Sequence, residues 1–364
     1  MKKLYPILIT LSLFSCREMM TDNTEETFLA FWKTLDDNYS YFEEKGINWD
    51  SIYNVYYPQA QQSKYNEELA AIFQKIITQI NDEYVWIYRY SNKYWSDIRS
   101  EHFVTRADTL YVNNDYYRLT NDSVYRAAME IDFGLYKKWF NETQSPFRFW
   151  QDTVKKYTFI AIYGNFYDDK YYDYCVQPER LLYFLDSLSY QNGIIIDIRQ
   201  NNSEYEKILD VASFFFENEL IAFYEKVRLG AGRDNFSEKT PKILTGQGKI
   251  SANIPVVVIT GPSTAMAANY FANVMKQLPN CKIVGEQSEG FRYIADRQMI
   301  TLPNYWNLHY PLIVSKKYDA QGNNLDLVGV KPDIFVEMRN FWRYNMKDSM
   351  IMKALEILDS ANGF

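Results

Sequence analysis

Hydrophobic residues recur at helical spacing near the start of the chain. Two sets of apolar residues follow this spacing: Phe28, Phe31, Trp32 and Leu35, then Leu69, Ile72, Phe73, Ile76 and Ile80. Apolar positions three and four residues apart are typical of amphipathic helices. Trp49-Asp50-Ser51 predicts the start of a middle helix, and Gly46 and Pro58 predict breaks. We therefore expect an N-terminal helical region over residues 28–85.

A different pattern begins near residue 157, where continuous Val and Ile runs alternate with amphipathic stretches. The predicted strands are 159–162, 193–198, 255–259 and 282–284, and the predicted helices are 178–189, 205–216, 263–278 and 348–358. Continuous apolar runs separated by helices indicate parallel strands that are covered on both faces. Residues 298–314 predict a hairpin. The sequence thus predicts an α/β core over residues 157–364, joined to the helical region by an irregular connecting region, 86–156.

The first residues have the pattern of an export signal. Lys2 and Lys3 precede an apolar stretch that is too short to span a bilayer. Leu13-Phe14-Ser15-Cys16 has the form of a bacterial lipobox, whose cysteine becomes the acylated first residue. We expect a lipoprotein signal peptide over 1–15, lipidation at Cys16, a solvated tether over 16–27, and attachment to the cell envelope, at the outer membrane. An ordinary signal peptide, with Cys16 left as a thiol, is the alternative.

Composition narrows the classes of partner. The net charge is -7 and no run of Lys or Arg is present, which argues against nucleic acid. Two scattered histidines, His102 and His309, and no clustered Cys or carboxylate pattern predict neither a metal nor a cofactor. Cys175 and Cys281 could pair or remain buried thiols. The 32 tyrosines fit either a glycan-binding or protein-binding surface or half-exposed strand positions.

Several fragments, in order, resemble family S41, the tail-specific serine peptidases. Residues 193–199 resemble the strand that ends in a DLRGN-like turn, and 256–272 resemble the strand and helix that carry the nucleophile. Residues 283–286 resemble the family's GE turn, 329–334 its PDI ending, and Asn81-Asp82 its DGH motif. The resemblance implies a ClpP/crotonase-like α/β core. Many S41 peptidases also carry a PDZ module, but the Gly-rich loop that a PDZ domain needs is not visible.

The resemblance also shows which chemical groups are missing. Where family members read T-A-S-A-A-E, this chain has Met266 at the serine position, and a thioether cannot form an acyl-enzyme. Phe291 stands at the family's lysine position, and Tyr84 stands where another branch of the family has its histidine base. Neither side chain is an effective base at neutral pH.

The turn after residue 199 and one nearby serine complete the candidate site. Active members have glycines in this turn, whose N–H groups face the oxyanion, but this chain reads Gln200-Asn201-Asn202-Ser203. Ser263 is the fallback nucleophile, although a serine before a helix usually caps it. The resemblance implies a cleft lined by Arg199, Gln200, Asn201, Gly261, Ser263, Met266, Asn269, Glu286, Ser288, Phe291 and Tyr84.

These observations leave three hypotheses. The leading one is an S41 peptidase homologue at the cell envelope that is catalytically inactive and binds a peptide or protein in the retained cleft. The second is an active serine-type peptidase that uses a displaced serine, Ser263. The third is a structural or glycan-binding envelope lipoprotein, in which Met266, Phe291 and Tyr84 fill the cleft.

Overall fold

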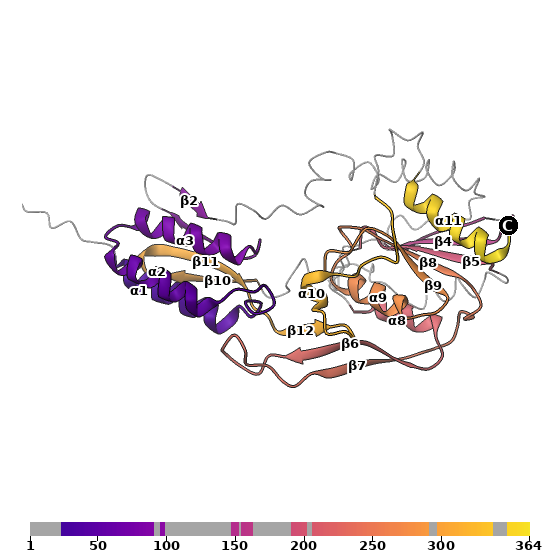
Figure 1. Ribbon diagram of the computed structural model, residues 1–364, viewed down its shortest axis with the longest axis horizontal. Helices are drawn as coiled ribbons and strands as arrows, with labels where there is room; N and C mark the ends of the chain where they lie inside the picture. The colour runs from indigo at the N-terminus through magenta and orange to yellow at the C-terminus, as the bar shows by residue number, and fades with distance from the viewer. Residues whose placement is uncertain are drawn as a thin grey trace, which may run out of the picture.

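The computed structural model describes residues 23–90, 95–98, 147–152, 154–162, 191–201, 206–290, 297–337 and 348–364. The predicted signal peptide, Cys16, most of the tether, the helix at 178–189, His102, Cys175 and Phe291 lie outside these residues. The described elements form two lobes, with the ribbon of β6 and β7 running along both (Figure 1). None of the described helices is long and apolar enough to cross a membrane.

The N-terminal lobe contains three helices and a four-stranded antiparallel sheet. The helices are α1 (Thr24–Asn38), α2 (Trp49–Gln62) and α3 (Asn66–Ile80). The sheet has the order β10-β11-β1-β2, from β10 (Arg297–Leu302), β11 (Trp306–Pro311), β1 (Trp86–Tyr90) and β2 (Trp95–Ile98). The predicted hairpin at 298–314 is β10 and β11, which pair with each other. On its other side β11 pairs with β1, more than 200 residues earlier in the chain.

The predicted apolar stripes form the core of this lobe. Phe28, Phe31 and Phe73 are fully buried together with the sheet residues Trp306 and Leu308. The middle helix begins at the predicted position, and the Asn48 side chain caps it by accepting a hydrogen bond from the Ser51 N–H at 2.9 Å. The prediction that Pro58 breaks this helix is wrong, because Pro58 lies inside α2, where proline removes one helical hydrogen bond without ending the helix.

The second lobe is built on a six-stranded sheet of order β13-β9-β8-β5-β4-β3. Its strands are β3 (Phe147–Gln151), β4 (Tyr157–Ile162), β5 (Gly193–Asp197), β8 (Val256–Thr260), β9 (Cys281–Gly285) and β13 (Ile334–Phe335). All neighbouring pairs are parallel except β3 with β4. The predicted parallel core is therefore confirmed, and no PDZ domain is evident in the described residues.

Helices cover both faces of this sheet, as continuous Val and Ile strands require. One face packs against α8 (Ile208–Ala212), the 3-10 turn η1 (Ser213–Phe215) and α9 (Ala267–Lys276). The other face packs against α11 (Ser349–Asn362). Two predicted helices begin later than expected: the one at 205–216 is α8 plus η1, and the one at 263–278 begins at Ala267.

A third, smaller sheet and a short helix lie at the junction of the lobes. The sheet has the order β12-β6-β7, from β12 (Ser315–Tyr318), β6 (Glu219–Val227) and β7 (Thr240–Thr245), and the helix is α10 (Leu325–Val328). Just beyond β6, the guanidinium of Arg228 donates to the carbonyls of Asp37, Asn38 and Ile313 at 2.6–3.1 Å. This side chain therefore ties the ribbon to the end of α1.

Candidate functional site

The turn between β8 and α9 has an uncommon backbone conformation at Met266. Its φ is 57° and its ψ is -126°, in a region that residues other than glycine rarely occupy. Holding a residue there costs about 1–3 kcal/mol and persists only where the surroundings enforce it. A sharp, strained turn from strand to helix is also the geometry that exposes a nucleophile in hydrolases. The elbow-like backbone is therefore present, with methionine at its apex.

Hydrogen bonds from two neighbouring turns enforce this conformation. The Ala265 N–H donates to the Asn201 carbonyl at 3.0 Å, and the Met266 N–H donates to the Gly290 carbonyl at 2.7 Å. Asn201 follows β5 and Gly290 follows β9, the two strands on either side of β8. Because parallel strands end at the same edge of a sheet, three segments that are distant in sequence converge here.

Met266 itself offers no reactive group. Its side chain is 3% exposed, and a thioether can neither attack a carbonyl nor transfer a proton. In the neighbouring turn, the Asn201 N–H donates to the Ile198 carbonyl at 3.0 Å. That N–H is therefore not directed at the place where an oxyanion would form.

Ser263 does not cap the helix, so that prediction is wrong. The N-cap residue of α9 is Met266, and the buried hydroxyl of Ser263 has no hydrogen-bond partner among the residues that the structure describes. The hydroxyl of the neighbouring Thr264 stabilises the turn instead. It accepts from the Gly261 N–H at 3.0 Å and donates to the Ile198 carbonyl at 2.9 Å. The sequence analysis did not single out Thr264, although Thr264 is the first residue of the T-A-x-A-A motif.

Asn269 and Ser288 stabilise the frame of the site. The Ser288 hydroxyl donates to Asn269 Oδ1 at 2.5 Å and accepts from the Val330 N–H at 2.6 Å, while Asn269 Nδ2 donates to the Leu325 carbonyl at 2.9 Å. These bonds join α9 to the turn after β9 and to the segment around α10. Both side chains are buried, so their polar atoms serve the interior of the protein.

Arg199 also points into the protein. Its guanidinium pairs with Asp197 at 2.6 Å and with Asp348 at 2.7 Å, and all three side chains are buried. Asp348 is in addition the N-cap of α11, where it accepts from the N–H groups of Met350 and Ile351. The cluster therefore connects β5 to the helix on the opposite face of the sheet, a partnership that the sequence analysis did not anticipate.

The remaining predicted cleft residues differ in burial. Gly261 packs against the Arg199 side chain, and Glu286 is buried, with its backbone paired to Thr260. Gln200 is half-buried. The structure therefore brings together Arg199, Gln200, Asn201, Gly261, Ser263, Met266, Asn269, Glu286 and Ser288 at one edge of the sheet. Phe291 follows Gly290 directly but lies outside the described residues.

Tyr84 belongs to the N-terminal lobe. Its N–H donates to the Asp82 carboxylate at 3.0 Å, and the Arg297 guanidinium lies over its ring at 5.0 Å. Asp82, the aspartate of the motif, also accepts from the Tyr39 hydroxyl and from Lys45, each at 2.8 Å. Burial and the Asp82 charge raise the pKa of Tyr39 well above its ordinary value. The motif aspartate therefore organises the interior of this lobe.

Other candidate groups also have structural surroundings. Cys281 is a free, buried thiol, and burial raises the pKa of Cys281. His309 stacks on Trp86, with ring centroids 3.9 Å apart. Among the residues that the structure describes, no group of three or more His, Cys, Asp or Glu side chains could hold a metal ion.

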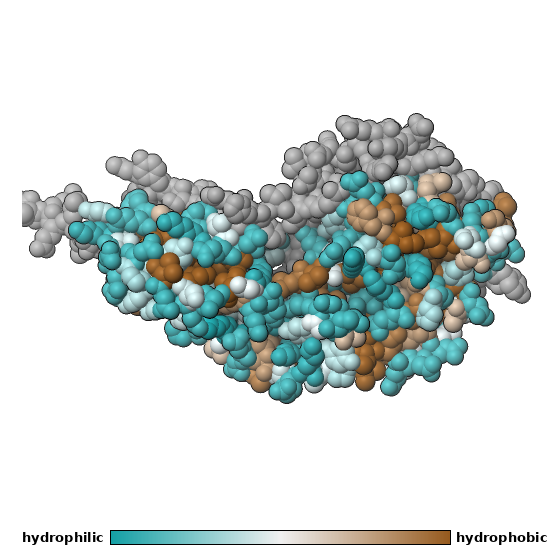
Figure 2. Space-filling model, viewed as in Figure 1, coloured by the Kyte–Doolittle hydropathy of each residue, from teal (hydrophilic) through white to brown (hydrophobic). Residues whose placement is uncertain are grey.

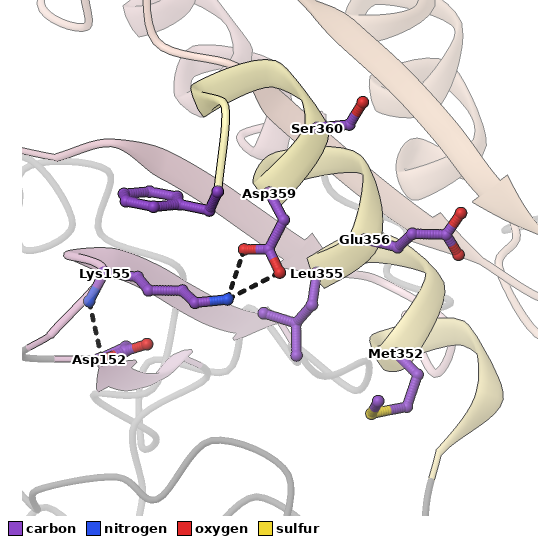
Figure 3. A pocket seen from close by; sticks show the side chains of 8 residues that line it. Asp152, Lys155, Met352, Leu355, Glu356, Asp359 and Ser360 are labelled. Carbon is purple, nitrogen blue, oxygen red and sulfur yellow. Dashed lines mark hydrogen bonds and ion pairs between the residues drawn. The ribbon is translucent and has the colours of Figure 1, made fainter.

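A pocket lies away from the elbow, beside α11. It has a volume of about 730 Å³ and is lined by Asp152, Lys155, Met352, Leu355, Glu356, Asp359, Ser360 and Phe364. Lys155 reaches across it to both oxygens of Asp359 at 2.7 Å (Figure 3). The Tyr157 hydroxyl also donates to Asp359, at 2.9 Å. The strongest polar groups of this pocket are thus already paired with each other.

Comparison with known proteins agrees with these features. Residues 176–336 match the model of peptidase family S41, and residues 20–78 match that of the tricorn protease C1 domain. No curated protein matches the chain.

Two solved structures share the fold. A protein from Parabacteroides merdae that is assigned as a peptidase has a TM-score of 0.65 and 19% identity over 92% of this chain and 96% of that chain. Mature CPAF complexed with lactacystin has a TM-score of 0.59 and 10% identity over 94% of this chain and 99% of that chain. At these identities the likeness concerns the fold alone. The family model, the ordered motifs and the fold together identify this chain as an S41 peptidase-like protein.

Proposed function

We propose that this protein is a catalytically inactive S41 homologue at the cell envelope, which binds segments of peptide or protein at the edge of the sheet where the elbow lies. The observation that carries the proposal is Met266: the elbow-like backbone is held by two turns, while the side chain at its apex has no reactive group. The loss extends to the neighbouring turn, where the Asn201 N–H donates to a carbonyl of its own turn.

The energetic cost of the Met266 conformation supports a retained role for the turn between β8 and α9. A position that has lost its nucleophile could relax to an ordinary turn, which would recover about 1–3 kcal/mol. Binding of an extended peptide does not require a nucleophile, because main-chain hydrogen bonds and side-chain pockets supply its affinity. Substrate recognition can therefore persist where hydrolysis does not.

Activity of the purified mature domain on unfolded and C-terminally tagged proteins tests the proposal. We expect no turnover by the natural protein, together with saturable binding of the same substrates by fluorescence anisotropy. A Met266→Ser, Phe291→Lys double variant restores both groups of the Ser-Lys branch, and a Met266→Ser, Phe291→Leu variant is its matched control. Turnover by the natural protein would overturn the claim of inactivity, and absence of binding would overturn the claim of recognition.

A second candidate function rests on Ser263, whose buried hydroxyl has no hydrogen-bond partner. An unsatisfied buried hydroxyl costs about 1–3 kcal/mol, and such groups are often found at functional sites. In this alternative, Ser263 is a displaced nucleophile. Labelling by a serine-reactive phosphonate that disappears in Ser263→Ala would favour it over the inactive homologue.

The envelope location is the remaining part of the proposal. It rests on the lipobox ending at Cys16. Metabolic labelling with a palmitate analogue should mark the natural protein in a bacterial host but not a Cys16→Ala variant. Export of an unlabelled natural protein would instead favour an ordinary signal peptide.

A further inference from the structure

The strand β10 is an unprotected edge of the N-terminal sheet. Among the residues that the structure describes, β10 has a neighbour on one side only in the order β10-β11-β1-β2, so alternate backbone N–H and C=O groups of residues 298–302 face outward. Met299 and Ile300 are 55% and 40% exposed. In Figure 2, apolar surface lies over the part of this lobe where Figure 1 draws β10 and β11.

Two other edge strands of the molecule carry residues that normally prevent pairing with another chain. The edge strand β7 contains Pro241 and Lys242, and the edge strand β12 contains Lys316 and Lys317. Proline and lysine are common protections of an exposed edge. Between Gln298 and Leu302, β10 contains neither. Arg297 and Pro303 stand at the two ends of β10, so the stretch from Gln298 to Leu302 is the part of this edge that is open to an added strand.

A groove of suitable size runs beside this edge. It has a volume of about 510 Å³ and is lined by Glu26, Leu29, Ala30, Lys33, Thr34, Asp37, Asn38, Ile300, Thr301, Leu302, Pro303 and Tyr310. The lining residues of α1 recur at three and four positions, so they form one stripe, roughly 18 Å long at 1.5 Å per residue. Six residues of β10 extend over roughly 20 Å. Ile300, Thr301 and Leu302 are the residues of β10 that line the groove, and the α1 stripe beside them is long enough for an added strand of about six residues.

The direction of α1 and its charges define the occupant. The Thr27 hydroxyl donates to the Pro303 carbonyl at 3.3 Å, so the start of α1 lies at the end of β10. Lys33 and Asp37 neutralise each other at 2.9 Å, whereas no Lys or Arg of the described ranges pairs with Glu26. A strand added antiparallel to β10 would begin next to Glu26, where its first residues would meet an unneutralised carboxylate.

We propose that β10 and α1 form a strand-addition site for an extended segment of a partner protein, with a basic residue at its start and alternating apolar residues. The backbone of the segment pairs with β10, its apolar side chains contact Leu29 and Ile300, and its basic residue pairs with Glu26. The site lies in the other lobe from Met266 and does not depend on the function proposed for the elbow.

The test uses the mature protein and a fluorescein-labelled probe peptide, Lys-Val-Thr-Val-Thr-Val-amide. We expect Ile300→Lys to weaken binding by about tenfold or more, because it places an edge-protecting charge in the groove. The matched control is Ile243→Lys on β7, which is also an exposed isoleucine of an edge strand, at 50% exposure, and it should leave the affinity within about twofold. Thermal unfolding of both variants verifies that each remains folded.

Two further measurements complete the test. Glu26→Gln, or a probe that begins with Glu, should weaken binding by about threefold to tenfold, in a salt-dependent way. Hydrogen exchange should show new protection within 297–302 when the probe binds. Equal weakening by Ile300→Lys and Ile243→Lys would overturn the proposal. So would a dimer in light scattering that Ile300→Lys abolishes while the probe does not bind, because the occupant would then be a second copy of this chain.

Discussion

Two buried polar features near the elbow are in opposite states. Around Arg199 the charged groups are paired, since the guanidinium contacts carboxylates from β5 and from the N-cap of α11. The turn at 261–266, whose Gly261 packs against Arg199, contains a strained Met266 and a Ser263 hydroxyl without a partner among the described residues. The difference shows that one part of a motif can stabilise the frame while its neighbour retains a costly geometry that stability alone does not require.

The largest loss of stability is expected when the ion-pair cluster of Arg199, Asp197 and Asp348 is disrupted. Arg199→Ala leaves Asp197 and Asp348 buried without the guanidinium, so the free energy of unfolding should fall by about 3–5 kcal/mol. Urea denaturation measures it. Lys155→Ala, which breaks a partly exposed pair with Asp359, is the control and should cost at most about 1 kcal/mol. Similar losses of unfolding free energy in Arg199→Ala and Lys155→Ala would show that the Arg199 cluster is no more stabilising than a partly exposed ion pair.

The strain at Met266 can be isolated by a pair of small residues. Met266→Gly and Met266→Ala remove the same buried side chain, but only glycine accepts a φ of 57° without strain. We expect the glycine variant to be the more stable by about 1 kcal/mol. Inside α9 the order should reverse, because Ala268→Gly should cost about 1 kcal/mol. Finding alanine the more stable residue at position 266 would mean that the elbow is not strained.

Ser263→Ala tests the unpaired hydroxyl. Removing it should leave stability unchanged or raise it by up to about 1 kcal/mol, because an unsatisfied polar atom leaves the interior. Asn48→Ala is the comparison, since it removes an observed helix cap and should cost about 1 kcal/mol. A loss of that size for Ser263→Ala would show that the hydroxyl has a stabilising partner.

The smallest effect concerns Asp326, a buried carboxyl that has tyrosine partners instead of a guanidinium. It accepts from the Tyr270 hydroxyl at 2.6 Å and from the Tyr41 hydroxyl at 3.3 Å. Burial raises the pKa of Asp326 above its ordinary value of 3.8. Between these two pKa values the folded state holds a proton that the unfolded state has lost, so this group lowers stability as pH rises through that window.

Asp326→Asn should remove this contribution. Unfolding free energies measured from pH 4 to neutral should then decline less with pH, or rise more, than those of the natural protein. An unchanged pH dependence would mean that Asp326 remains ionised in the folded protein throughout this range.

The sequence was most informative where burial and local chemistry agree. The Val and Ile runs located the parallel strands because both faces of this sheet are covered, and Trp49-Asp50-Ser51 located the start of α2. The family motifs located Met266 at the start of α9. In each case the determining residues are neighbours in the chain.

The missed features depend on contacts between distant residues. Ser263 was predicted to cap α9, but carbonyls of Asn201 and Gly290 hold the turn and delay the helix. Arg199 was assigned to a cleft from the family resemblance. Its pairing with Asp348 could not be predicted, because Asp348 is 149 positions away. Pairing of the β10–β11 hairpin with β1 likewise follows from the tertiary fold, which periodicity does not encode.

The tie made by Arg228 has a consequence for sequence change. Its guanidinium binds backbone carbonyls of Asp37, Asn38, Gly230, Gly232 and Ile313. Every amino acid supplies a carbonyl, so the bonds to Asp37, Asn38 and Ile313 do not depend on their side chains. Gly232 differs because its φ of 107° favours glycine, and the Ser40 hydroxyl also accepts from Arg228. Lysine has no planar fork with which to replace the guanidinium. The contact between the lobes can therefore diverge at positions that contribute only a carbonyl, and saturation mutagenesis should find positions 228 and 232 less tolerant than positions 37, 38 and 313.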